Sequence, residues 1–181
     1  MPSDTSKANV DTDNRISKIA NAAEIYGQRS FDNYAQIRSF AENLRGELCN
    51  WLSPNHQCVY LVPPEGEFGP QNYRSAAYSV SGQGYLPLKP ISFGLAVRIS
   101  SEQDFMRLRI TCRKEGEVMF VNIEDTRDMR IELPATKDHL MPLFEHIYTH
   151  ILEFFTLSVD EYDNGNYGGT DIGFDIMRIT E

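Results

Sequence analysis

The fold is decided by residues 91–133, ISFGLAVRISSEQDFMRLRITCRKEGEVMFVNIEDTRDMRIEL. Apolar side chains occupy every second position in most of this stretch, and a period of two is typical of half-buried strands. The connections are short, as at Lys114-Glu115-Gly116, whereas parallel strands need long crossovers. The pattern therefore predicts an antiparallel meander with apolar positions at Phe93, Leu95, Val97, Ile99, Met106, Leu108, Ile110, Cys112, Met129, Ile131 and Leu133, and a central strand over 118–123.

Helical spacing precedes the meander. We expect Asn14 to cap a first helix, which ends or bends at Gly27. We expect Ser30 to cap a second helix, which stops within residues 50–55. Its apolar side chains recur at steps of three and four, namely Phe31, Tyr34, Ile37, Ala41, Leu44, Leu48 and Trp51.

The remaining elements complete the predicted fold class. A short strand over 59–62 ends at two prolines, residues 72–80 are a weaker strand candidate, and residues 172–179 form a short closing edge strand. Residues 137–157 return to helical spacing with a broad apolar face. We therefore expect an α+β protein: two N-terminal helices, an antiparallel meander of about five to six strands, a long C-terminal helix packed on the sheet and the edge strand.

Composition limits the class of protein. The chain has 181 residues, 41% of them apolar, and a formal charge of −9. Residues 1–14 are polar and are expected to form a mobile tail, while residues 15–181 are expected to form one α+β domain. No apolar run approaches a membrane span, and the first fifteen residues contain no stretch typical of a secretory signal. Three cysteines and an acidic balance favour a cytoplasmic protein that binds neither nucleic acid nor membranes.

Charge is unevenly distributed along the chain. Residues 132–181 contain ten acids and two bases, which is −8 of the total. In the predicted meander, one side of the sheet carries five arginines: Arg98, Arg107, Arg109, Arg113 and Arg130. They could form ion pairs across strands with nearby glutamates, or a patch that docks an acidic partner or an anion. A third alternative is self-association, in which this patch meets the acidic C-terminal region of another subunit.

The last predicted helix holds a candidate metal site. His139, His146, His150 and Glu153 lie within a narrow arc beside its apolar face. Two histidines four residues apart can reach one divalent ion, and a carboxylate one turn on adds a ligand. The glutamate that follows the first histidine in zinc-protease helices is missing. The alternative is a polar helix flank, so we predict no cofactor.

No motif is specific enough to name a family or a reaction. The sequence has neither a Gly-x-Ser-x-Gly elbow nor a phosphate-binding glycine-lysine loop. Phe68, Tyr85 and Leu86 lie on proline-containing loops and are candidates for a partner-binding patch. The favoured hypothesis is a soluble, non-catalytic interaction or regulatory module that binds a protein partner or itself. The alternatives are a small-molecule binder or enzyme with a cavity between sheet and long helix, including Asn122, and a metal-dependent enzyme.

Overall fold

The computed structural model describes residues 6–124, 126–166 and 175–178, with side chains from residue 14 onward. The first helix begins at Ser6, and the division into a tail over 1–14 and a domain over 15–181 stays a prediction. The elements are helix α1 (Ser6–Leu52), strand β1 (Val59–Val62), the 3-10 turn η1 (Arg74–Ala77), strands β2 (Ile91–Arg98), β3 (Asp104–Glu115), β4 (Val118–Ile123) and β5 (Met129–Glu132), helix α2 (Lys137–Asp163) and strand β6 (Asp175–Arg178).

The antiparallel meander is confirmed. The strands lie in the order β1-β2-β3-β4-β5, every pairing is antiparallel, and β6 adds a sixth strand. Strand β3 is long enough to pair with β4 along its second half and with β6 along its first half. The weak strand candidate over 72–80 is a 3-10 turn with a single bridge from Tyr78 to Phe93. Of the predicted closing strand, residues 172–174 and 179 lie outside the described residues.

The prediction of two N-terminal helices is wrong, because α1 is continuous through Gly27 and Ser30. Glycine costs about 1 kcal/mol within a helix, but it does not by itself end one. Ser30 does not cap a helix: its hydroxyl donates to the carbonyl oxygen of Tyr26, 2.9 Å away. The loop before β2 supports this stretch, since the Tyr85 ring stacks on Tyr26 at 5.6 Å and its hydroxyl donates to Ala23 O at 3.2 Å.

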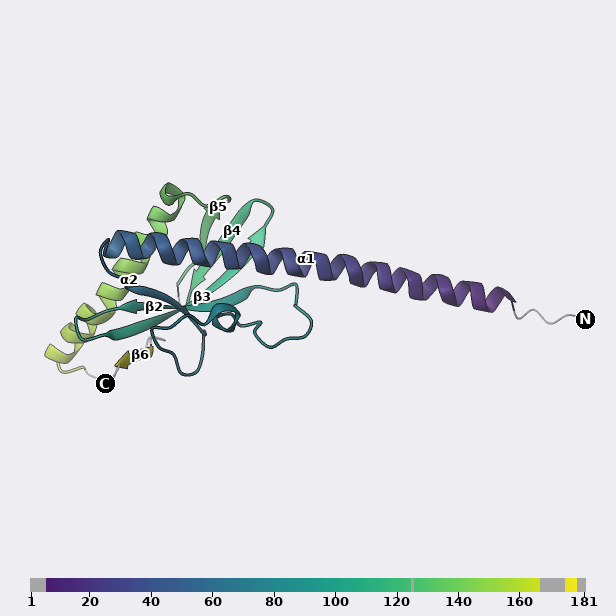
Figure 1. Cartoon of the computed structure of the whole chain (residues 1–181). Coiled ribbons are helices and arrows are strands. Elements are labelled where there is room, and N and C mark those ends of the chain that lie inside the picture. The colour runs from purple at the N-terminus through teal and green to yellow at the C-terminus, as the bar shows by residue number, and fades with distance from the viewer. Residues whose placement is uncertain (1–5, 125, 167–174, 179–181) are drawn as a thin grey trace, which may run out of the picture.

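The two helices cover one face of the sheet (Figure 1). The second half of α1 contributes Ile37, Leu44 and Leu48 to the core, each fully buried. The first half of α2 contributes Leu140, Leu143, Phe144 and Ile147, which are also fully buried. These side chains pack the first half of α2 on the sheet, and the ligand cavity between sheet and α2 stays a prediction.

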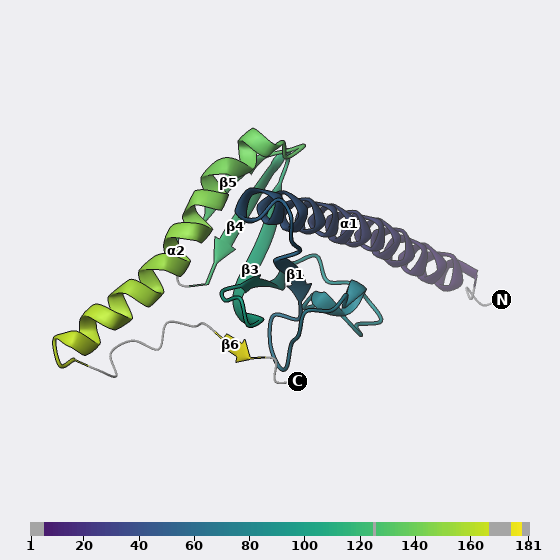
Figure 2. The same ribbon diagram turned by 60° about the vertical axis from the view of Figure 1, so that its left-hand side comes forward.

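Both helices extend beyond the strands. The first half of α1 runs away from the rest of the molecule, and the second half of α2 passes the end of the sheet (Figures 1 and 2). A capping box at the start of α2, in which Thr136 and His139 each bond the other's backbone, fixes where this helix begins. In the described part of the chain, no helix has an apolar stretch sufficient to span a bilayer.

Candidate functional site

The sheet face turned away from the helices carries the predicted arginines. Side chains alternate along β3, so Arg107, Arg109 and Arg113 lie opposite the buried Leu108 and Ile110. The strand register places Arg109 opposite Gly94 and Arg113 opposite Phe120. Asn122 also lies on this open face, where it pairs with Thr111, and not between the sheet and α2.

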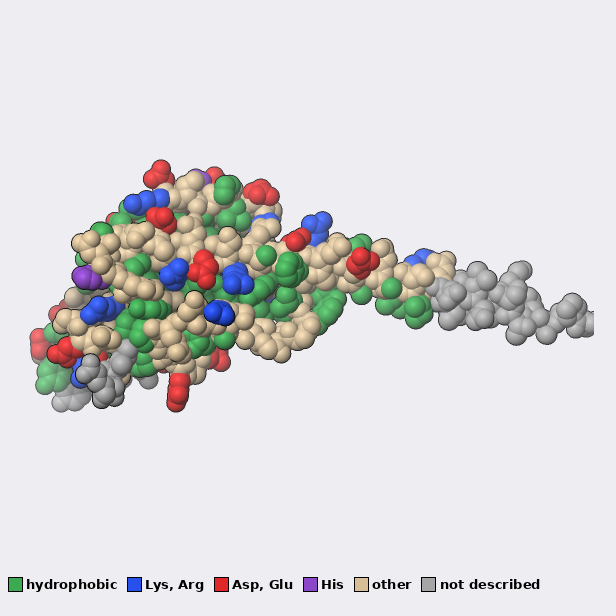
Figure 3. Space-filling view, in the orientation of Figure 1, with side chains coloured by type: hydrophobic (Ala, Val, Ile, Leu, Met, Phe, Trp, Pro, Cys, Tyr) green, Lys and Arg blue, Asp and Glu red, His purple; other side chains and the backbone are tan. Residues whose placement is uncertain are grey.

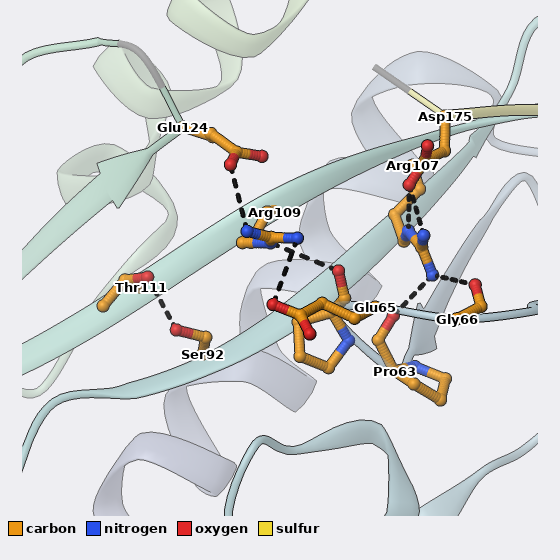
Figure 4. Close-up of polar contacts among 10 residues, drawn as sticks. Pro63, Glu65, Gly66, Ser92, Arg107, Arg109, Thr111, Glu124 and Asp175 are labelled. Carbon is orange, nitrogen blue, oxygen red and sulfur yellow. Dashed lines mark hydrogen bonds and ion pairs between the residues drawn. The ribbon is translucent and has the colours of Figure 1, made fainter. Parts of the chain in front are cut away.

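Arg107 is buried, with only 5% of its surface exposed. Its guanidinium donates to Pro63 O at 3.1 Å and Gly66 O at 2.8 Å, and it pairs with Asp175 (Figure 4). Gly94 leaves the space for this side chain, because a Cβ there would lie 2.9 Å from Arg107 Cδ. Arg107 therefore holds the β1–η1 loop on the sheet and is not available to a partner.

Arg109 lies in a recess between two carboxylates. It contacts Glu124 at 3.0 Å and Glu65 at 3.4 Å, and its Nε donates to Pro64 O at 3.2 Å (Figure 4). The recess has a volume of about 460 Å³ and is also lined by Ser79, Ser92, Thr111 and Asn122. Two carboxylates and one guanidinium give the recess a net negative charge, so the recess does not suit an anion.

The other three arginines of the predicted patch also have partners within the chain. Arg98 donates to the carbonyl oxygens of Ser100 and Ser101, both at 2.9 Å. Arg113 pairs with Glu115 and Asp128 and lies over the Phe120 ring, and Arg130 lies 3.8 Å from Glu132. Exposed ion pairs of this kind contribute about 0–1 kcal/mol each. These contacts favour the ion-pair interpretation of the arginine row over an anion patch.

The predicted metal ligands have separate surroundings. His139 belongs to the capping box of α2, and Glu153 is exposed. The His146 and His150 rings are stacked with centroids 6.1 Å apart. In the described residues, no three histidine, cysteine, aspartate or glutamate side chains are grouped closely enough to hold a metal ion. Within the part of the chain that the structure describes, the two histidines therefore have no third ligand beside them.

The predicted loop patch is divided between core and surface. Phe68 is buried beneath Arg107, whose guanidinium carbon lies 4.6 Å from the ring centroid. Leu86 is half-buried, and Tyr85 is exposed but is held by Tyr26 of α1. Tyr26 in turn accepts a hydrogen bond from Leu88 N at 2.9 Å. The loop's apolar residues therefore attach it to α1.

A pair of thiols was not predicted from the sequence. Cys49 Sγ near the end of α1 lies 3.1 Å from Cys58 Sγ, just before β1, and accepts a hydrogen bond from Cys58 N at 3.0 Å. Burial and, to a smaller extent, the neighbouring Cys49 together raise the pKa of the Cys58 thiol to about 12. Cys58 therefore stays protonated at neutral pH.

An apolar groove lies where α2 leaves the sheet. It has a volume of about 710 Å³, and its walls include residues from the end of α1, from the edge of the sheet and from α2. We call it the α2 groove; its apolar lining includes Leu52, Val97, Ile99, Tyr148, Leu152 and Phe155. We call the row of exposed side chains on this side of α2 the α2 stripe: Tyr148, Leu152, Phe155, Val159 and Tyr162. Their exposed fractions are 44%, 45%, 36%, 58% and 65%, in that order. Val159 and Tyr162 lie beyond the groove.

The projecting part of α1 is the second exposed apolar feature. Every residue from 14 to 26 is exposed, and Ile16 and Ile19 expose 63% and 65% of their surfaces. Ile19 and Ala23 precede the buried Ile37 and Ala41 by about five helical turns, so they lie on the same side of α1. We call residues 14–29 the α1 arm; Figure 3 shows hydrophobic side chains along it.

Fold and surface thus define an α+β protein with one helix-covered sheet face, one polar face and two projecting helix ends. No family model, no curated protein and no solved structure matches the chain.

Proposed function

We propose that this protein is an interaction module that binds other polypeptides through the α1 arm and the α2 groove. The observation that supports this most is the exposure of Ile16, Ile19, Leu152 and Val159 on helix surfaces that extend beyond the sheet. Contiguous apolar surface on a folded protein is typical of a binding site. The three free cysteines favour the cytoplasm as the place where it acts.

The α1 arm adds an energetic argument. A helix without tertiary contacts is marginal in water below about 12–15 residues, and most helices in proteins are stabilised by packing of one apolar face. The loop before β2 reaches α1 at Ala23, Tyr26 and Asn33. The exposed residues 14–22 precede these contacts. Docking of their apolar face on a partner would stabilise this end of the helix.

Site-specific photo-crosslinking tests the proposal. A photoreactive amino acid is placed at Ile19 or Leu152 of the full chain, and at Arg127 in the exposed β4–β5 turn as control. We expect crosslinked protein from the first two positions, with product masses that identify one partner, and none from Arg127. Absence of a specific product at both Ile19 and Leu152 would contradict the proposal.

The recess at Arg109 supports a second candidate function, the binding of a small polar molecule. Its hydroxyl, amide and carboxylate groups suit an uncharged or cationic polyol better than an anion. Asn122 and Ser92 are already bonded, to Thr126 O and to Thr111 respectively, so a ligand would replace existing hydrogen bonds. Calorimetric titration with neutral and cationic polyols, using Glu124→Gln as the comparison, tests this candidate: no heat from either protein would contradict it.

A further inference from the structure

We infer that the partner is a second copy of this chain, and that the α1 arm of each copy docks in the α2 groove of the other. This inference rests on the proposed function and names the occupant of the groove. It follows from the shape of the two apolar surfaces, from their charges and from the position of the groove relative to the arm.

The two surfaces match in form. The arm presents Ile16, Ile19 and Ala23 at steps of three and four, which is the spacing of a helix that lies in a groove. The α2 stripe from Tyr148 to Val159 extends over about 17 Å, and the sixteen-residue arm over about 24 Å. The small side chain of Ala23 allows close approach of two helices, so the arm fits along the exposed stripe.

The formal charges of the arm and of the α2 end favour contacts between an arm and an α2 end over contacts between two arms or two α2 ends. The arm, residues 14–29, contains three bases and one acid, which gives a formal charge of +2. Residues 148–163 of α2 contain four acids and no lysine or arginine, which gives −4. Two arms side by side would repel each other, as would two α2 ends, whereas an arm beside an α2 end brings opposite charges together. The lining of the groove itself includes Arg98, whose guanidinium is bonded to Ser100 O and Ser101 O. Glu153 and Asp160 are exposed and lie about 120–140° around the helix from the centre of the stripe, so they act on a docked arm through the net charge of α2 and not by direct contact.

The arm cannot reach the groove of its own chain. Leu52, the last residue of α1, forms part of the groove, and the arm ends at residue 29 of the same continuous helix. The 23 residue steps from position 29 to Leu52 span about 35 Å of helix, which places the arm and the groove at opposite ends of α1. A second molecule is therefore required. A two-fold arrangement forms the arm–groove contact twice, which helps it to approach the ~800 Å² per partner that stable interfaces bury.

A charge-swap experiment tests the inference on the full chain. One variant is Lys18→Glu with Arg29→Glu on the arm, and the other is Glu153→Lys with Asp160→Lys on α2. Light scattering after size-exclusion chromatography should give about 41 kDa for the wild type, twice the chain mass of 20.7 kDa. Each variant alone should dissociate at least about tenfold more readily, because the arm of the first becomes −2 against an α2 end of −4, and the α2 end of the second falls from −4 to 0.

An equimolar mixture of the two variants should bind more tightly than either variant alone, since the +2 arm of one variant again meets the −4 α2 end of the other, while the −2 arm meets a neutral α2 end. Arg127→Glu, in the exposed β4–β5 turn, should leave the dimer unchanged, and circular dichroism checks that every variant is folded. A monomeric wild type, or a mixture no tighter than its components, would overturn the inference. If Ile19 still crosslinks to a different protein, the proposed function stands without the dimer; if neither position crosslinks, both fail.

Discussion

Cys49 Sγ lies 3.1 Å from Cys58 Sγ, so the end of α1 and the start of β1 are joined by a contact between two thiols. The same sulfur of Cys49 accepts the backbone N–H of Cys58, and the Cys49 thiol lies 3.3 Å from His56 O. The two sulfur atoms need to approach by about 1 Å to reach the length of a disulfide bond. Cys58 also lines the α2 groove, so the pair lies beside the proposed binding surface.

We predict that oxidised glutathione converts Cys49 and Cys58 into a disulfide within one chain, releasing two molecules of glutathione thiol. Cys49 is the attacking group, because burial keeps the Cys58 thiol protonated. Mass spectrometry of peptides should detect the link, and Cys49→Ser should abolish it. Cys112, which is buried and whose pKa is raised by burial, serves as the control. Disulfides that involve Cys112 in the folded protein would contradict this prediction.

Arg107→Ala should lower the free energy of unfolding by about 1–3 kcal/mol, because the carbonyl groups of Pro63 and Gly66 lose the buried donor that holds the β1–η1 loop on the sheet. Arg109→Ala is the matched control on the same face of β3. Arg109 is partly exposed, and its ion pairs should contribute less than about 1 kcal/mol. Urea titration, monitored by the fluorescence of Trp51, measures the free energy of unfolding of both variants. Equal losses in the two variants would contradict the structural role assigned to Arg107.

Tyr78→Phe should leave stability unchanged or raise it by about 1 kcal/mol. The Tyr78 hydroxyl is buried and has no hydrogen-bond partner in the described part of the chain, so its removal relieves a desolvation cost. The same burial raises the pKa of Tyr78. Tyr85→Phe loses the bond to Ala23 O and should destabilise slightly. Thermal unfolding compares the two variants, and a marked loss of stability in Tyr78→Phe would contradict the prediction.

Asp104→Asn should make the attachment of β6 to β3 less dependent on pH in the acid range, where the Arg107–Asp175 pair remains as the second ionic contact. Hydrogen bonds from Arg178 and Ser100, both at 2.9 Å, lower the pKa of Asp104 from its usual 3.8. A lowered folded pKa means that the stabilisation is complete above the usual value and is lost as pH falls through the folded value. The protection of the amides of residues 104–107 against hydrogen exchange should therefore fall more on acidification in the wild type than in the variant. Identical acid profiles would contradict this.

The sequence predicts the sheet well, because alternation and short turns are local signals. It also places the five arginines on one side, since strand register fixes side-chain direction. It cannot tell that Arg107 is buried, because this depends on Gly94 and on carbonyl groups more than forty residues away. Nor can it tell that Tyr85 contacts α1 just before Gly27, because Tyr85 lies sixty-two residues from its hydrogen-bond acceptor Ala23.

The apolar face of α2 is a second feature that the sequence predicts only in part. Its spacing predicts a helix and an apolar face, but it does not show where the sheet ends beneath that face. Leu143 and Ile147 are fully buried, whereas Leu152 and Val159, on the same helix, are exposed. A partner surface and a core surface have the same sequence pattern, and only the arrangement of the strands distinguishes them.

Hydrogen exchange of the α1 arm in the purified chain is the most direct measurement of whether this helix end is a docking surface. If it docks, peptides within residues 14–29 exchange at least about tenfold more slowly at high protein concentration than in the double variant Ile16→Glu with Ile19→Glu, and this protection falls on dilution. Peptides covering residues 148–159 change in parallel. Equal exchange of the arm in the wild type and the variant at every concentration would contradict docking on a second copy.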